Sequence, residues 1–251
     1  MATLLAARPE AGIVLAGIAT RPGSRRRDWW PRACRQVTNP SELAALAPDL
    51  VVEAAGRDAV GMWGEAALRS APRFVLCSAS ALADDLLRER LVAVAAANGS
   101  QLEISHGALV GIQAISAASL RRMNAVTHVI RKPPPAWRGT AAESLFDPAT
   151  LREALVFFRG TAREAASAYP ANANAVVTTA LAGMGLDRTR VELVADPLID
   201  KNVHQLCAAG DFGSLDMTIA NEPMPSNPRT SDMTALAIAH MLLTRTQFLV
   251  V

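Results

Sequence analysis

The sequence predicts an α/β fold with two domains, and two observations support this prediction. In roughly the first hundred residues, short β-branched runs alternate with alanine-rich helical runs, which is typical of a doubly wound parallel sheet. After about residue 107 the strand-like segments would have to pair with strands that are distant in the sequence. This favours an α+β domain with a mixed or antiparallel sheet. We therefore expect a first domain over residues 1–107, completed by a C-terminal helix within residues 230–251, and a second domain over residues 108–229.

The elements of the first domain alternate along the chain. Residues 12–19 (GIVLAGIA) predict a strand, and residues 40–47 predict a helix that Asn39 could cap. Further strands are expected at residues 49–54, 73–78 and 101–105. The helices between them are expected at residues 57–70 and 82–98.

The second domain interleaves strands and helices less regularly. Its strands are expected at residues 126–131, 190–195 and 215–219. Its helices are expected at residues 161–169 and 173–181. A last helix over residues 230–243 is of the kind that packs back on a first domain.

The composition excludes several classes of protein. The chain has 251 residues, of which 51% are hydrophobic, and this length can bury a substantial core. A net charge of +2 gives no general attraction to nucleic acid, and no apolar stretch approaches the roughly 20 residues that span a bilayer. The three cysteines are widely spaced, which argues against a disulfide framework and a closed zinc site. We expect a cytoplasmic protein that needs no metal.

The opening residues lack a glycine-rich turn. A dinucleotide-binding sheet begins with a strand, a G-x-G-x-x-G turn and a helix whose N-terminus meets the pyrophosphate. Residues 2–10 look like the end of that helix, so residues 12–19 would be the second strand and about 12 to 20 residues would be missing. Either the start codon is assigned too far downstream or the turn is lost. We favour the first interpretation, because the rest of the site looks intact.

The loop after residues 12–19 bears on the choice of cofactor. An acidic residue would be expected there for NAD, because it binds the ribose hydroxyls. The loop has no such carboxylate, whereas Arg21, Ser24 and Arg25 could bind the 2′-phosphate of NADP. The alternative interpretation is a solvated basic loop.

The most informative motif is Asn202-Val203-His204, which precedes an alternating segment at residues 212–219. A histidine held at the mouth of a strand can face a cleft, and its pKa near neutrality lets it accept and return a proton in one cycle. For an isolated motif, a structural or exposed histidine is the alternative.

A series of short segments follows the order found in one enzyme family. The earlier segments are VEAA (52–55), CSASALAD (77–84), HGALVG (106–111) and RKPP (131–134). The later segments are FRGTAREA (158–165), YPANAN (169–174), LVADP (193–197), NVH (202–204) and NPRTS (227–231). In this ordered series the chain resembles the aspartate dehydrogenase family.

The resemblance implies a Rossmann-like nucleotide-binding domain, here without its first strand, and a dihydrodipicolinate-reductase-like substrate domain. It implies an NAD(P)-dependent L-aspartate dehydrogenase that converts L-aspartate reversibly, through iminoaspartate, to oxaloacetate and ammonia. A role in pyridine nucleotide biosynthesis and a homodimeric state, without nucleic-acid or membrane partners, are implied as well.

The resemblance also assigns roles to residues. The histidine of the N-x-H motif is catalytic in the family, and this role falls on His204. The cofactor contacts fall on Ala108 and on Asn174, with Asn172 the less favoured alternative. The segment around Ala108 departs from the family pattern, since His106 stands where serine is usual and residues 109–111 replace the commoner isoleucine-glycine pair. We also expect cofactor contacts from three residues nearer the N-terminus, which are Arg21, Ala55 and Ser78.

The substrate carboxylates need cationic or hydrogen-bonding partners. Lys132 follows a strand-like run and precedes three prolines, although a surface lysine at a strand end is the alternative. Arg229 and Thr230 are expected where the terminal helix begins, and helix N-termini attract anions. Asn227 or Ser226 could equally be plain helix caps there.

Two other functions stay open on the sequence alone. The fold could serve a dehydrogenase of another small amino or hydroxy acid, because fold does not settle substrate. The chain could also be a homologue with impaired cofactor binding that acts as a non-catalytic binding protein.

Overall fold

The computed structural model describes residues 2–224 and 227–247. The chain divides into two compact units, one within Met1–Ser105 and Ala239–Val251 and the other within His106–Ile238. Each unit has its own sheets, and each is described separately below.

The first unit is built on parallel strands. Strand β1 (Gly17–Ala19) pairs with β2 (Arg35–Val37), and β4 (Arg73–Leu76) lies between β3 (Val51–Glu53) and β5 (Gln101–Ile104). The predicted parallel pairing is confirmed, with the strands grouped into a two-stranded and a three-stranded sheet.

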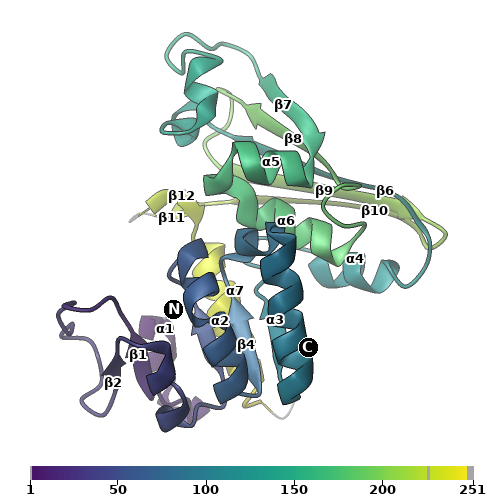
Figure 1. Cartoon of the computed structure of the whole chain (residues 1–251). Coiled ribbons are helices and arrows are strands. Elements are labelled where there is room, and N and C mark those ends of the chain that lie inside the picture. Colours follow the sequence, from purple (N-terminus) through teal and green to yellow (C-terminus); the bar gives the residue numbers. More distant parts are fainter. Residues whose placement is uncertain (1, 225–226, 248–251) are drawn as a thin grey trace. The chain divides into compact units, whose positions relative to one another are not determined.

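Two long helices accompany the three-stranded sheet and lie side by side (Figure 1). Helix α2 (Arg57–Ser70) has the predicted bounds. Helix α3 (Asp85–Asn98) begins after Asp84, whose carboxylate accepts the Leu87 N–H, and follows a 3-10 turn at Ala79–Ala83. Gly64 of α2 allows the close approach, because a Cβ there would lie 2.8 Å from the Leu91 side chain of α3.

Two predicted elements of this unit are wrong. Only the last three of residues 12–19 form a strand, because β2 pairs with no residue before Gly17, and a short helix α1 (Ala2–Ala6) and a 3-10 turn (Pro9–Ala11) precede it. Residues 40–47 form two 3-10 turns, Pro40–Glu42 and Ala44–Leu46, which end where Ala47 adopts a left-handed conformation. The predicted Asn39 cap is confirmed, since its side chain accepts the Ser41 N–H at 3.0 Å.

The second unit contains a five-stranded mixed sheet in the order β10-β9-β6-β8-β7. The central strand β6 (Met123–Lys132) runs parallel to β8 (Arg190–Ala195) and antiparallel to β9 (Asn202–Gly210). The edge strands β10 (Gly213–Asn221) and β7 (Leu155–Thr161) are antiparallel to their neighbours. The predicted mixed sheet is confirmed, and the N-x-H motif lies on strand β9 itself, not ahead of a strand.

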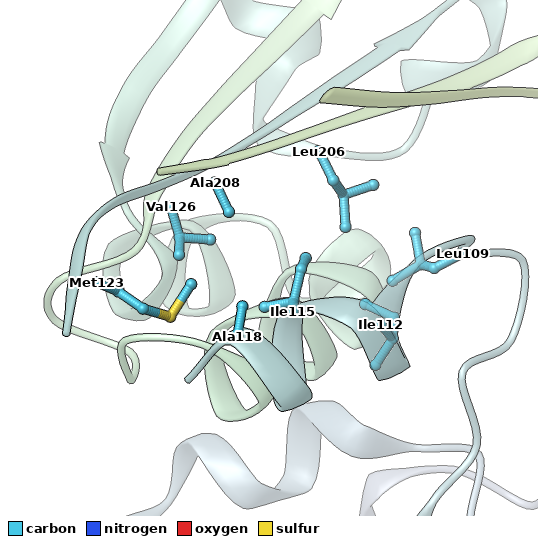
Figure 2. Close-up of a cluster of buried hydrophobic side chains, with 8 residues drawn as sticks. All are labelled: Leu109, Ile112, Ile115, Ala118, Met123, Val126, Leu206 and Ala208. Atoms are coloured by element: carbon cyan, nitrogen blue, oxygen red, sulfur yellow. The ribbon is translucent and has the colours of Figure 1, made fainter. Parts of the chain in front are cut away.

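Three helices pack on this unit's sheet: α4 (Ile112–Ala118), α5 (Ala162–Ala168) and α6 (Ala173–Ala182). Val126, Leu206 and Ala208 of β6 and β9 point toward Ile115 and Ala118 of α4 in one apolar cluster (Figure 2). Burial alternates along β9, so Asn202 and His204 share the inward face with Leu206.

The remaining elements of the second unit are short. Single 3-10 turns occur at Pro134–Trp137, Ala141–Ser144 and Pro170–Asn172. A two-stranded hairpin follows, made of β11 (Pro223–Met224) and β12 (Asn227–Ser231). The terminal helix α7 (Met233–Thr244) then begins three residues later than predicted, and it extends into the first unit's part of the chain.

No helix within residues 2–224 and 227–247 is long and apolar enough to cross a membrane.

Candidate active site

The inward face of β9 and β6 carries a pair of hydrogen-bonded histidines. His204 lies opposite Ile130 of β6, and its Nδ1 atom is 3.0 Å from Nε2 of His128 on that strand. His128 is fully buried, whereas 6% of the surface of His204 remains accessible. Within the described part of the chain, the second ring nitrogen of His204, Nε2, has no hydrogen-bond partner.

Both imidazoles are held in the neutral form. Burial lowers the pKa of His204 well below its usual value, and the neighbouring His128 and Lys132 act in the same direction. Burial alone lowers the pKa of His128 to about 3. Neutral imidazoles prevail at pH 7, so one nitrogen of each ring carries a proton and the other a lone pair that can accept one.

Lys132 ends strand β6 on the same inward face. Its side chain is 5% exposed, donates to Oδ1 of Asn172 at 2.8 Å and lies 5.5 Å from the ring centroid of Trp137. Burial lowers its pKa to about 8, so the ammonium is still mostly protonated at pH 7. The interpretation of Lys132 as a surface lysine is therefore wrong.

Asn202, two residues before His204, is buried without a partner. Its side-chain amide is 1% exposed, and neither Nδ2 nor Oδ1 has a hydrogen bond to the described residues. Leaving buried polar atoms unpaired costs about 1–3 kcal/mol each, so such an amide marks a place where water or a polar ligand completes the structure. The motif spacing of two could have indicated this, because it places both side chains on one face of a strand.

The cofactor candidates of the second unit lie near these groups. Ala108 is joined to the end of β10, since its carbonyl oxygen accepts from Nδ2 of Asn221, the residue that pairs with Asn202. Asn174 is in the first turn of α6, where its carbonyl oxygen accepts from Thr178. Asn172 is at the N-cap position of the same helix, but its side chain accepts from Lys132 instead of capping the helix, so the structure gives the two asparagines different surroundings.

In the first unit, Ala55 and Ser78 are organised by one carboxylate. Glu53 accepts the N–H groups of Ala55 and Gly56 at 2.6 and 2.7 Å, and the N–H and hydroxyl of Ser78 at 2.9 and 3.0 Å. These bonds join the carboxyl ends of β3 and β4, the edge at which parallel sheets bind nucleotides. Sequence reasoning placed Glu53 in a matching segment without a role.

The arginine-rich loop of the first unit forms an open hollow of about 770 Å³. Ser24 and Arg25 line it together with Trp29 and Trp30, whereas Arg21 is not part of the lining. Arg26 lies over the Trp30 ring at 5.5 Å and is therefore engaged in the fold of the loop.

The structure does not place Arg229 and Thr230 at a helix N-terminus. Both belong to strand β12, because pairing with β11 extends to Ser231 and helix α7 starts at Met233. Their side chains lie outside the described part of the structure. No group of three histidine, cysteine, aspartate or glutamate side chains among the described residues could hold a metal ion.

Comparison with known families first identifies the class of protein to which the chain belongs. Residues 1–105 match the NAD binding domain of homoserine dehydrogenase, and residues 113–245 match the C-terminal domain of aspartate dehydrogenase. With a parallel-stranded first unit and a mixed-sheet second unit, this combination defines a nicotinamide-dependent dehydrogenase.

The relatives then give the family. The L-aspartate dehydrogenase of Brucella anthropi is 48% identical over 98% of this chain and 91% of its own length. That of Ruegeria pomeroyi is 40% identical over 98% of this chain and 89% of its own. The crystal structure of aspartate dehydrogenase from Thermotoga maritima matches 91% of this chain and 87% of its own, with a TM-score of 0.72 and 25% identity. The chain belongs to the L-aspartate dehydrogenase family, which confirms the resemblance noted in its sequence.

Proposed function

We propose that this chain is an NAD(P)-dependent L-aspartate dehydrogenase, which releases the amine of L-aspartate as ammonia and gives oxaloacetate reversibly. Family membership supports this proposal. The observation that carries it is the set of buried polar groups, His204, Lys132 and Asn202, on the inward face of a sheet whose other inward side chains are largely apolar. Such a set fits a small, polar, anionic substrate.

Each unit, taken by itself, presents groups that could contact part of the cofactor. The Glu53-centred turn puts Ala55 and Ser78 at the carboxyl ends of β3 and β4. From the second unit, Ala108 and Asn174 would contact the nicotinamide portion, and the hollow beside Arg25 suits a ribose phosphate. When bound, the nicotinamide supplies the hydride chemistry, and the protein supplies position and proton transfer.

The proposed role of His204 is proton transfer during exchange of water for ammonia. Water adds to the carbon of the substrate iminium, the C–O bond forms, and the released proton goes to His204. The protonated His204 then gives this proton to the amine nitrogen of the adduct. The C–N bond breaks, ammonia leaves, and His204 accepts the hydroxyl proton as the carbonyl forms. His204 passes this proton to the ammonia, so that one iminium and one water give oxaloacetate and ammonium.

Lys132 and Asn202 are proposed to bind the substrate. A buried ammonium attracts a carboxylate strongly, because little water screens the pair. The amide of Asn202 has donor and acceptor atoms to offer to a carboxylate or an amine. We propose that Arg229 and Thr230 contribute further contacts from strand β12.

We also propose that the enzyme is cytoplasmic, since Cys34, Cys77 and Cys207 are all free thiols. A homodimer remains our proposal from the family resemblance.

A substrate panel tests the proposed function. With either oxidised cofactor, kcat/KM for L-aspartate should exceed that for L-alanine, L-glutamate and L-malate by about 10² or more. L-alanine lacks the second carboxylate and L-malate lacks the amine, so each leaves buried polar partners unpaired, whereas L-glutamate is one methylene too long for a site that fits L-aspartate. Formation of reduced nicotinamide, followed by its absorbance, measures each rate. A preference for L-malate would identify a hydroxy-acid dehydrogenase. Cofactor binding without turnover of any of the four acids would contradict the proposal.

The pKa of Lys132 predicts how anion binding depends on pH. Succinate carries two carboxylates and no amine, so its charge is constant from pH 7 to 10. Because burial lowers the Lys132 pKa to about 8, the ammonium needed for binding is lost as the pH rises above that value. Calorimetry with the reduced cofactor at saturation should give a constant affinity below pH 8 and a fall of about tenfold per pH unit above it.

The matched variant is Lys132→Arg, whose guanidinium stays charged over this range. Its succinate affinity, even if weaker overall, should not fall between pH 8 and 10. A pH-dependent fall of equal size in both proteins would assign the titration to another group.

A further inference from the structure

Three side chains from three elements form a continuous buried chain. His204 of β9 contacts His128 of β6 through Nδ1 and Nε2 at 3.0 Å, and Nδ1 of His128 lies 3.0 Å from the hydroxyl of Thr179 on α6. The Thr179 hydroxyl also lies 3.1 Å from the carbonyl oxygen of Ala175, one helical turn earlier. His128 and Thr179 have no exposed surface.

The proton positions in this chain follow from the Ala175 carbonyl, which can only accept. If the single hydroxyl proton of Thr179 goes to that carbonyl, the hydroxyl oxygen accepts from Nδ1–H of His128. Nε2 of His128 is then unprotonated and accepts from Nδ1–H of His204. The remaining nitrogen of His204, Nε2, therefore carries a lone pair.

The opposite arrangement of protons makes one hydrogen bond fewer. If the Thr179 hydroxyl donates to His128, its bond to the Ala175 carbonyl is lost, and Nε2–H of His128 donates to His204. His204 then carries its proton on Nε2 and cannot accept another there. Loss of a hydrogen bond between fully buried groups disfavours this arrangement.

We propose that Thr179 and His128 are positioning residues that hold His204 as its Nδ1–H tautomer, with the basic Nε2 nitrogen presented to the substrate. This inference rests on the proposed function only in taking the substrate as the partner of Nε2. The two residues act through His204 and do not touch the substrate themselves.

A neutral orienting residue suits a site that contains Lys132. Burial keeps His128 uncharged, since it lowers the pKa of His128 to about 3. Lys132 is the charged group whose electrostatic field lowers the pKa of His204. A carboxylate in place of His128 would attract the Lys132 ammonium, whereas the imidazole leaves that charge for the substrate.

The tautomer of His204 can be observed directly. The chain has four histidines, so long-range ¹H–¹⁵N correlation spectra of the whole protein can be assigned by single substitutions. We expect the proton of His204 on Nδ1 in the unaltered protein. In Thr179→Val, Nδ1–H of His128 would have no acceptor, and because an orphaned buried N–H is rarely tolerated, its proton should move to Nε2. His204 should then carry its own proton on Nε2.

Two variants serve as controls for Thr179→Val. Thr179→Ser keeps the hydroxyl and should keep the Nδ1–H tautomer. Thr178→Val removes a neighbouring hydroxyl that makes the same kind of bond, 2.9 Å to the Asn174 carbonyl, without contacting His128. It should leave both the tautomer and the rate unchanged.

Kinetics provide the second measurement. Thr179→Val should lower kcat about 10- to 100-fold with little change in KM. In this variant only the minor Nδ1–H tautomer of His204 would have a lone pair on Nε2 and could act as the base. His128→Leu should lower kcat similarly, while His128→Gln should restore much of it, since its amide oxygen can accept from Nδ1–H of His204.

A proton on Nε2 of His204 in the unaltered protein, or an unchanged tautomer in Thr179→Val, would overturn the inference. The spectra require no turnover, so failure of the inference is distinguishable from failure of the proposed function. If Thr179→Val does not fold, two measurements still test the inference. The proton of His204 should be on Nδ1 in the unaltered protein, and His128→Gln should have a higher kcat than His128→Leu.

Discussion

Replacing His204 with alanine should lower kcat for L-aspartate oxidation by about 10² to 10⁴-fold, the range expected when a general acid–base group is lost. The physical reason is that His204 is a neutral imidazole whose Nε2 has no hydrogen-bond partner among the described residues, on the inward face of β9. Steady-state kinetics at saturating cofactor measure the effect. The affinity for cofactor should change little, because the proposed cofactor contacts lie on other residues.

Thr178→Val is a suitable companion to His204→Ala, since Thr178 belongs to the same unit and its hydroxyl bonds the Asn174 carbonyl and neither histidine of the pair. Equal turnover by His204→Ala and the unaltered protein would remove His204 from the mechanism. A parallel loss of cofactor affinity and of melting temperature would instead point to a structural role for the ring.

Replacing Lys132 with methionine should lower kcat/KM for L-aspartate by about 30- to 5,000-fold, which corresponds to the roughly 2–5 kcal/mol lost when one partner of a buried charge pair is removed. The melting temperature should nevertheless rise, because the ammonium is desolvated in the free protein and methionine fills a similar volume without that cost. Initial rates and thermal unfolding measure the two effects, whose opposite directions exclude loss of activity through unfolding.

The chain offers a matched control in Lys201→Met. Lys201 is bonded to Glu222 at 2.7 Å, and both side chains are substantially exposed, so its removal should change kcat/KM less than about threefold. If Lys132→Met retained full kcat/KM, Lys132 would be a structural partner of Asn172 and Trp137 and not a substrate-binding residue.

The fold was predictable where the amino-acid pattern agrees with the pairing of strands and helices. Helix α2 and strand β8 have the predicted bounds, because their apolar residues recur with the period of their element. Strand β9 was missed although it lies beside the central strand. Its inward face begins with Asn202 and His204, two polar residues where a strand buried on that face would normally carry apolar ones.

The site was predictable only in part. The family resemblance singled out His204, and the need for a cationic partner of the substrate carboxylates singled out Lys132. The register of β6 and β9 places both side chains on one face. His128 and Thr179 were missed because their contacts join residues 51 and 76 positions apart in sequence, and no local pattern reports such contacts. The role expected for Arg229 and Thr230 depended on where a helix starts, and boundaries are the least reliable part of a sequence prediction.

The position of β6 at the centre of the five-stranded sheet has a consequence for local unfolding. Its backbone is hydrogen-bonded to β8 on one side and to β9 on the other, so it opens only when the sheet itself comes apart. His128 and Lys132 stand on this strand and His204 on its neighbour, whereas β7 and β10 are the strands that can fray. Transient detachment of either edge strand therefore leaves the geometry of these three side chains intact, and the groups proposed to transfer protons and bind substrate stay in place until the sheet itself unfolds.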